Sequence, residues 1–263
     1  MTDIQLPDPD YPRPERAENG KAYYWRPSGY PTDRYLAEVR DTDLLQHMGV
    51  PPRFRAHVLR MYRKSFRREV ETWIAQMPYI FRPAPSRLAD KPELCGIGLL
   101  LWGDSGTYKT TTAAAVLLRL IRMQIPNLHP DPLPLKGGTY TGAAMGRFVP
   151  WQDAVEAFRN AVGDPESDEE SEGEFLRRSM RCESRHAVDA ANFLVLDDIS
   201  RERVTEWNFN ELHRIMRFRH DYARPTIVTT NYDPDDWEKK YGEVFAAFLH
   251  RAFIPVEFIK TDD

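Results

Sequence analysis

The segment at residues 96–113 constrains the fold of this 263-residue chain more than any other. An apolar run ends abruptly at Gly103, a loop containing Gly106 follows, and Lys109 and Thr110 open a run of helix formers. A strand, a glycine-containing loop and a helix in this order form the context that a phosphate-binding loop requires. Backbone N–H groups of such a loop favour a polyphosphate, and so does the dipole of the helix. The sequence therefore predicts a nucleotide site in an α/β fold.

The loop residues have different expected roles. We expect Lys109 to reach the β- and γ-phosphates of ATP and the Thr110 hydroxyl to ligate Mg²⁺. The other residues expected to surround the nucleotide are Gly103, Asp104, Ser105, Gly106, Thr107, Tyr108 and Thr111. Taken alone, the segment could also be a glycine-rich strand–helix turn with an incidental lysine.

Tyr108 departs from the phosphate-loop pattern, which has glycine directly before the lysine. A tyrosine keeps the backbone N–H donor, so the phosphate cradle need not lose a hydrogen bond. Its Cβ and ring add bulk at the helix start, where a positive φ would be strained. We therefore expect nucleotide binding to persist and leave the rate of hydrolysis open.

Composition restricts the classes of protein that the chain can belong to. The net charge of −4 gives no global reason to bind nucleic acid, so such binding must come from local patches. Cys95 and Cys182 have no zinc-ligand spacing and suit a reducing compartment. No signal peptide and no apolar run long enough to span a bilayer is evident. We expect a cytoplasmic protein with one large α/β domain and no membrane association.

The chain divides into three expected parts. Residues 1–48 are rich in proline and tyrosine and are expected to form an extended arm that binds a partner. Residues 49–90 form a basic helical segment leading into the core, and 91–263 form the core domain. Helical character over 41–81 is expected to break at Pro51-Pro52. The arginines of this segment favour either a solvated helix face or a contact with a phosphate backbone.

The middle of the core domain has an unusual charge pattern. After a Pro/Gly-rich connector over 126–146, apolar residues from Trp151 to Val162 recur at helical spacing. Seven of the eleven residues over 164–174 are acidic, which predicts a solvated loop insertion that would repel nucleic-acid phosphate. The helix expected after it is a better candidate for a DNA contact through Arg177, Arg178, Arg181 and Arg185.

Two further strands are expected to deliver polar groups to the same edge of the sheet. The apolar run over 193–196 ends in Asp197 and Asp198, the pattern of a Walker B strand. We expect Asp197 to hold Mg²⁺ and Asp198 to orient or deprotonate the attacking water. The strand over 225–230 ends in Asn231, an amide that can position water without adding charge. Each of these, taken alone, could be turn or cap chemistry.

The order of these motifs resembles that of the DnaC/IstB-like AAA+ ATPases. The resemblance starts near Gly49, in Gly-Val-Pro-Pro-Arg-Phe-Arg, and includes Glu202, Thr205-Glu-Trp207 and Arg219 besides the motifs above. It implies a three-layer P-loop core of the AAA+ type, with a parallel sheet and no C-terminal lid domain. It places Asn231 at sensor 1. It also implies inter-subunit ATP sites in a homo-oligomer, where an arginine of the neighbouring subunit acts on the phosphoryl charge. Arg251 is the position best placed for that arginine, although a surface arginine is the alternative.

The resemblance implies a function in DNA replication. It predicts an ATPase that loads a replicative DnaB-type helicase onto single-stranded DNA. Two alternatives stay open: an IstB-like ATPase that assists a transposase, and a poorly hydrolysing nucleotide-dependent adaptor, which Tyr108 would favour.

Overall fold

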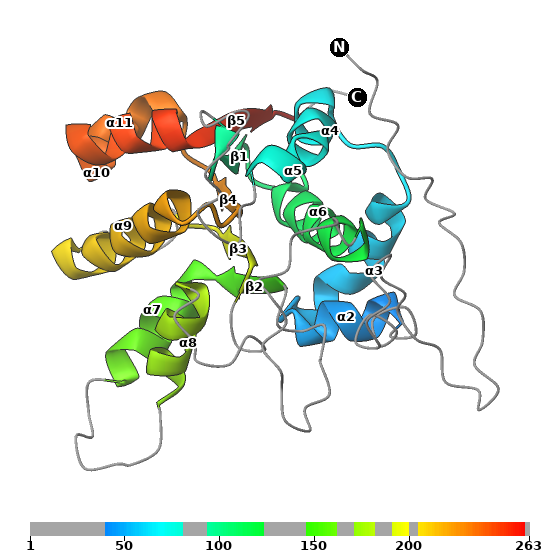
Figure 1. Cartoon of the computed structure of the whole chain (residues 1–263), viewed down its shortest axis with the longest axis horizontal. Helices are drawn as coiled ribbons and strands as arrows, with labels where there is room; N and C mark the ends of the chain where they lie inside the picture. The colour runs from blue at the N-terminus through cyan, green and yellow to red at the C-terminus, as the bar shows by residue number, and fades with distance from the viewer. Residues whose placement is uncertain are drawn as a thin grey trace.

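A single parallel sheet organises the chain (Figure 1). The computed structural model describes residues 40–80, 94–123, 146–161, 171–181, 191–199 and 205–260. The strand order is β2-β3-β4-β1-β5, and every neighbouring pair is parallel. The strands are β1 (Gly98–Gly103), β2 (Gly146–Pro150), β3 (Phe193–Asp197), β4 (Thr226–Thr230) and β5 (Phe253–Phe258). All residues of β3 and β4 are buried, as parallel strands covered on both faces require.

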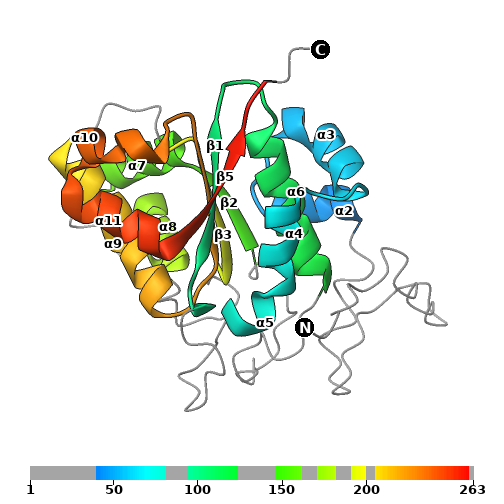
Figure 2. The ribbon, with the colours of Figure 1, turned by 90° about the horizontal axis from the view of Figure 1, so that it is seen from above.

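Helices that precede β1 share one face of the sheet with the helix that follows the phosphate-binding loop (Figure 2). These helices are α2 (Asp41–His47), α3 (Pro52–Tyr62), α4 (Arg68–Ala75), α5 (Met77–Ile80) and α6 (Lys109–Met123). Side chains of all five join one hydrophobic cluster with the sheet. An ion pair of 2.8 Å between Arg119 and Glu71 also links α6 to α4.

This packing refines the expected organisation of the N-terminal part. The break at Pro51-Pro52 is confirmed, because α2 ends before it and Pro52 occupies the first turn of α3. Leu44 and Leu45 of α2 are buried in the same cluster as the sheet. The arm expected over residues 1–48 therefore ends in a packed helix, and residues 1–39 lie outside the described part of the chain.

The other face of the sheet carries the remaining helices (Figure 2). They are α7 (Trp151–Asn160), α8 (Glu172–Met180), α9 (Glu206–Asp221), the short 3-10 helix η5 (Pro234–Asp236), α10 (Trp237–Tyr241) and α11 (Glu243–Ala252). A second hydrophobic cluster binds them to the sheet. The sheet thus forms the middle of three layers, which confirms the expected fold class. The helix predicted from Trp151 is α7.

The end of the acidic segment differs from its predicted loop conformation. Ser171 caps α8 through a capping box with Glu174, so the helix begins inside the segment, at Glu172. Gly173 is buried, and a Cβ there would lie 2.3 Å from the carbonyl oxygen of Ala157. Acidic residues suit the first turn of a helix, whose dipole favours negative charge. Charge density alone therefore mispredicted these last residues, and 162–170 lie outside the described part.

A further difference concerns the end of the expected connector. Its last residue, Gly146, begins β2, whose Phe148 N–H donates a 2.6 Å hydrogen bond to the carbonyl of Met48. Such a short edge strand has too few residues to show a periodic pattern. Within the described residues, none of the helices is long and apolar enough to cross a membrane.

Candidate functional site

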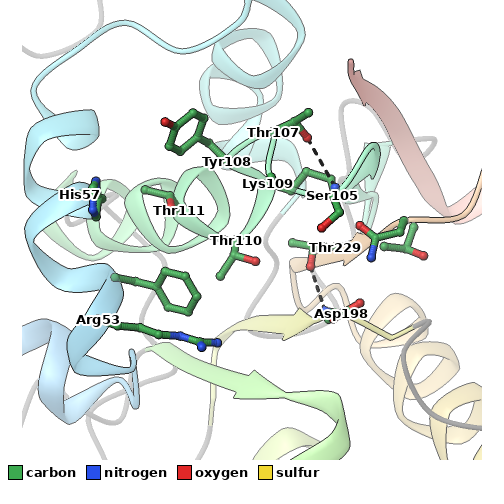
Figure 3. Close-up of a pocket in the computed structure, with 14 residues that line it drawn as sticks. Arg53, His57, Ser105, Thr107, Tyr108, Lys109, Thr110, Thr111, Asp198 and Thr229 are labelled. Carbon is green, nitrogen blue, oxygen red and sulfur yellow. Dashed lines mark hydrogen bonds between the residues drawn. The ribbon is translucent and has the colours of Figure 1, made fainter. Parts of the chain in front are cut away.

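The predicted motifs meet at the carboxyl edge of the sheet. The loop after β1 leads into α6, and β3 and β4 end beside it, where open α/β sheets bind their ligands. A pocket of about 480 Å³ lies there, within the usual size range of ligand sites. Figure 3 shows its lining, which is Arg53, Phe54, His57, the loop and helix residues 105–111, Asp198, Thr229, Thr230 and Asn231.

Lys109 is held inside the loop that it terminates. Its side chain is only 7% exposed, and its Nζ donates hydrogen bonds to the carbonyl oxygens of Gly103 at 2.8 Å and Asp104 at 2.5 Å. Burial lowers the pKa of Lys109, while Asp198, Asp104 and Asp197 act in the opposite direction. The ammonium group therefore lies at the floor of the loop. A polyphosphate bound there would supply the negative charge that a buried ammonium group needs as a partner.

Asp197 connects the two Walker-type motifs. Its Oδ1 accepts a 2.8 Å hydrogen bond from the Thr110 hydroxyl and a 2.6 Å hydrogen bond from the Thr229 hydroxyl. Burial raises the pKa of Asp197, and the two hydroxyl donors oppose that rise. The two residues predicted to hold Mg²⁺, Thr110 and Asp197, are thus brought into direct contact.

This oxygen pair fits the metal that was predicted. Hydroxyl and carboxylate oxygens are the ligands that Mg²⁺ prefers, usually with phosphate oxygens and water completing the shell. Within the described ranges, no group of three or more His, Cys, Asp or Glu residues could hold a metal ion. The arrangement therefore suits a metal that binds together with a nucleotide rather than a metal held by a protein cage.

Asp198 and Asn231 both line the pocket, as predicted from their places after two strands. The backbone N–H of Asp198 donates a 2.8 Å hydrogen bond to the Thr229 hydroxyl, and its φ of 56° turns the chain sharply after β3. A non-glycine residue in this region is uncommon and marks functional turns. The turn directs the chain into the pocket while Asp197 stays buried at the strand end.

Tyr108 also lines the pocket and has the left-handed backbone in which a tyrosine is strained, with a φ of 67°. Its carbonyl still accepts a 2.8 Å hydrogen bond from the N–H of Thr112, so the first turn of the helix forms normally. The loop therefore has the backbone path that glycine would favour, with an aromatic side chain added to it.

Five pocket residues were missed as site residues in the sequence. Arg53, Phe54 and His57 come from α3, and Thr229 and Thr230 are the last two residues of β4. The signal for the first three was Gly-Val-Pro-Pro-Arg-Phe-Arg, because Pro52 begins a helix whose first turns face the loop. Arg53 is a pocket residue as well as a member of the basic segment. No pattern marked Thr229, because its role follows from lying beside Asp197 across two strands.

Other predicted residues lie away from the pocket. Arg251 is exposed on α11 and does not line it. Arg177, predicted as a DNA contact, is bonded to Glu211 at 3.2 Å and to the carbonyl of Phe158 at 3.2 Å. Arg178 and Arg181 are both half-buried, and Arg185 lies outside the described residues, as does Glu202. The part of the helix that is described thus offers less free positive charge than its sequence suggested.

Comparison with known proteins identifies the fold. No protein-family profile matches the chain, and no curated protein sequence matches it. Among solved structures, the chain is similar to the DnaC helicase loader, with 20% identity and a TM-score of 0.52 over 79% of this chain and 99% of that one. It is also similar to DnaI (17% identity, TM-score 0.43, 79% of this chain and 86% of that one). A further match is the replication initiator DnaA bound to AMPPCP and single-stranded DNA (13% identity, TM-score 0.49, 80% of this chain and 51% of that one). The chain therefore shares the fold of the DnaC helicase loader, in agreement with the α/β fold class that its motifs predicted.

Proposed function

We propose that the chain binds ATP with Mg²⁺ and acts as a DnaC-like loader of a replicative DnaB-type helicase onto single-stranded DNA. The observation that carries the nucleotide part is the 2.8 Å contact between Thr110 and Asp197 beside the buried Lys109. P-loop proteins use a lysine, a threonine and an aspartate to bind the phosphates and the metal, which supports the proposed roles of these three groups. The fold shared with the DnaC helicase loader supports the replication part.

Each pocket residue then has a role that its position supports. Backbone N–H groups of the loop bind the phosphates, and Lys109 leaves the carbonyls of Gly103 and Asp104 to contact them. Thr110 and Asp197 would hold Mg²⁺, which would neutralise charge on the phosphates. Asp198 orients or deprotonates the attacking water, and Asn231 positions it.

The proposed assembly is a homo-oligomer with ATP at subunit interfaces. Arg251 is exposed and lies outside its own pocket, as expected of a residue that acts on a neighbouring subunit. Such an arginine stabilises the charge that develops on the transferred phosphoryl group. Residues 1–39 are proposed to hold the helicase, because the part of the arm from Asp41 onwards packs on the core.

Replacing Lys109 with alanine tests the nucleotide site. Ligand at a hundred times its Kd stabilises a protein by about 2.7 kcal/mol, so ATP with Mg²⁺ should raise the melting temperature of the natural protein by several degrees. We expect the Lys109→Ala variant to fold and to show no ATP-dependent shift. The control is Lys239→Ala, which removes an exposed lysine of α10. An unchanged ATP affinity in Lys109→Ala would contradict the assignment of the site.

The helicase-loading role needs a separate measurement. The protein is mixed with the DnaB-type helicase of its source and circular single-stranded DNA, and DNA-bound helicase is quantified with and without ATP. Loading should require ATP and should be lost in a chain that lacks residues 1–39 but keeps α2. An equal amount of DNA-bound helicase with and without the protein would disprove the loading role and favour the transposase-assisting alternative.

The strained backbone of Tyr108 favours the alternative of a poorly hydrolysing adaptor. The rate of phosphate release from ATP distinguishes this adaptor from an ATPase. An ATPase should release phosphate well above the Asp198→Asn variant, most clearly with single-stranded DNA present. A rate equal to that of Asp198→Asn under both conditions would favour a nucleotide-dependent adaptor.

A further inference from the structure

Tyr108 carries a conformational cost that the protein core does not offset. Its φ of 67° lies in the left-handed region, which glycine adopts without strain. Its side chain is 62% exposed, so the ring gains little from burial in the fold. A strained residue that persists at a binding site points to a role of that residue in binding.

The position of the ring in the pocket indicates what the role is. The groups that suit phosphate and metal, Lys109, Thr110 and Asp198, gather toward the end of the pocket near β3 and β4. Tyr108 lies on the opposite side, toward α3 and His57 (Figure 3). The pocket therefore has a polar end for phosphates and an aromatic end lined by Phe54, His57 and Tyr108.

A nucleotide has the same division, because its charged phosphates lead to a flat, weakly polar base. Aromatic side chains bind bases by stacking, which tolerates different bases because every base presents a π-face. An exposed ring gains this contact only when the nucleoside is present. The ring of Tyr108 can therefore offset its backbone strain in the bound state and not in the free state.

We infer that the ring of Tyr108 forms a wall of the nucleoside subsite, across from α3, and adds affinity for the base and sugar rather than for the phosphates. This inference rests on the proposed nucleotide binding. Tyr108 would then make the site bind a nucleotide more tightly than an inorganic polyphosphate. This role also explains why an aromatic residue occupies a position whose backbone favours glycine.

The test compares ATP with inorganic tripolyphosphate, both with Mg²⁺, by calorimetric titration of the full chain. In Tyr108→Gly we expect ATP affinity to fall about tenfold, the size of one lost stacking contact. Tripolyphosphate affinity should change by less than about twofold, because the loop N–H groups and Lys109 remain. Tyr108→Phe keeps the ring and should keep the ATP affinity. The matched control is Tyr222→Ala, which removes an equally exposed tyrosine at the end of α9.

A stability measurement sharpens the test. Without ligand, Tyr108→Gly should resist urea at least as well as the natural protein, because glycine relieves the strain. Equal ATP affinity in Tyr108→Gly and the natural protein would overturn the inference. Equal losses for ATP and tripolyphosphate would also overturn it, because they would indicate a damaged phosphate loop. A natural protein that binds neither ligand would instead refute the proposed nucleotide function, so the two failures are distinguishable.

Discussion

At the scale of single residues, the site depends on a buried carboxylate held by two threonine hydroxyls. Asp197 is only 8% exposed and accepts hydrogen bonds from Thr110 and Thr229. Thr229 also accepts the N–H of Asp198, so one hydroxyl orients both consecutive acids. The proposed metal-binding carboxylate and the proposed catalytic acid are thereby kept in different environments, one buried and one facing the pocket.

Burial of Asp197 predicts a pH-dependent cost in the nucleotide-free protein. Burial raises the pKa of Asp197 above the ordinary value of an aspartate, so the fold favours the protonated carboxyl. That stabilisation is complete below the unfolded-state pKa and is lost as pH rises through the raised folded-state pKa. The Asp197→Asn variant cannot titrate at this position. Its free energy of unfolding, relative to the natural protein, should therefore increase from pH 4 to pH 8.

Urea unfolding at several pH values measures this difference without nucleotide. The same variant should lose the part of its ATP affinity that depends on Mg²⁺, because an amide is a weaker metal ligand than a carboxylate. A difference in unfolding free energy that stays constant with pH would contradict the buried-carboxylate interpretation.

At the scale of elements, one buried arginine joins the ends of several of them. Arg219 of α9 is fully buried and bonds the carbonyl oxygens of Met180, Ala191, Asn192 and Pro225 and the hydroxyl of Thr226. These acceptors lie at the end of α8 and near the starts of β3 and β4. The guanidinium therefore fixes the amino-terminal edge of the two strands whose other ends carry Asp197 and Thr229.

Replacing Arg219 should destabilise the protein strongly. A lysine has fewer donors and lacks the planar fork, so Arg219→Lys leaves several buried carbonyls without a partner. We expect a loss of about 3–5 kcal/mol in the free energy of unfolding, as for other broken buried charge networks. Arg217→Lys on the same helix is the control. Arg217 is half-exposed beside Asp221, and its replacement should cost below about 1 kcal/mol. Similar urea midpoints for the two variants would contradict the anchoring role.

At the scale of the whole molecule, two hydrophobic clusters enclose the sheet, and the pocket opens at its carboxyl edge. Helix α3 belongs to the first cluster and also supplies Phe54, Arg53 and His57 to the pocket. Arg251, in the other layer, is exposed and does not line that pocket. The molecule thus presents the proposed ATP site and its proposed complement on different parts of its surface.

Subunit mixing tests the arrangement of Arg251 in the assembly. If Arg251 acts on the neighbour, then Arg251→Ala alone and Lys109→Ala alone should each lose at least about tenfold in ATPase rate. A mixture should recover activity, because an intact pocket of an Arg251→Ala subunit can meet an intact Arg251 of a Lys109→Ala subunit. Phosphate release across mixing ratios measures the recovery. A mixture no faster than either variant would contradict action between subunits, and Arg251→Lys checks whether charge alone suffices.

Residues 105–111, Asp198 and Asn231 line the pocket and Asp197 contacts Thr110, and each of these is marked in the sequence by a local pattern. A buried parallel strand is a short apolar run, and the polar residue that ends it emerges at one edge of the sheet whatever the strand order. The acidic segment misled for the opposite reason. Its charge density indicated a loop, whereas the capping of Ser171 and the tight contact of Gly173 with α7 begin a helix.

By itself, the sequence determined the motifs: the strand–loop–helix around Lys109, the strand ends at Asp197 and Asn231, and the unusual Tyr108. These features are local, because hydrogen bonding and hydrophobic periodicity act over a few neighbouring residues. Only the tertiary structure decided that Thr229 holds both acids, that Arg219 anchors the opposite strand ends and that α3 completes the pocket. Those roles depend on strand order, register and helix packing, which bring together residues distant in the chain. The backbone angle of Tyr108 belongs to both levels, because the loop motif places the residue and the folded loop sets its φ at 67°.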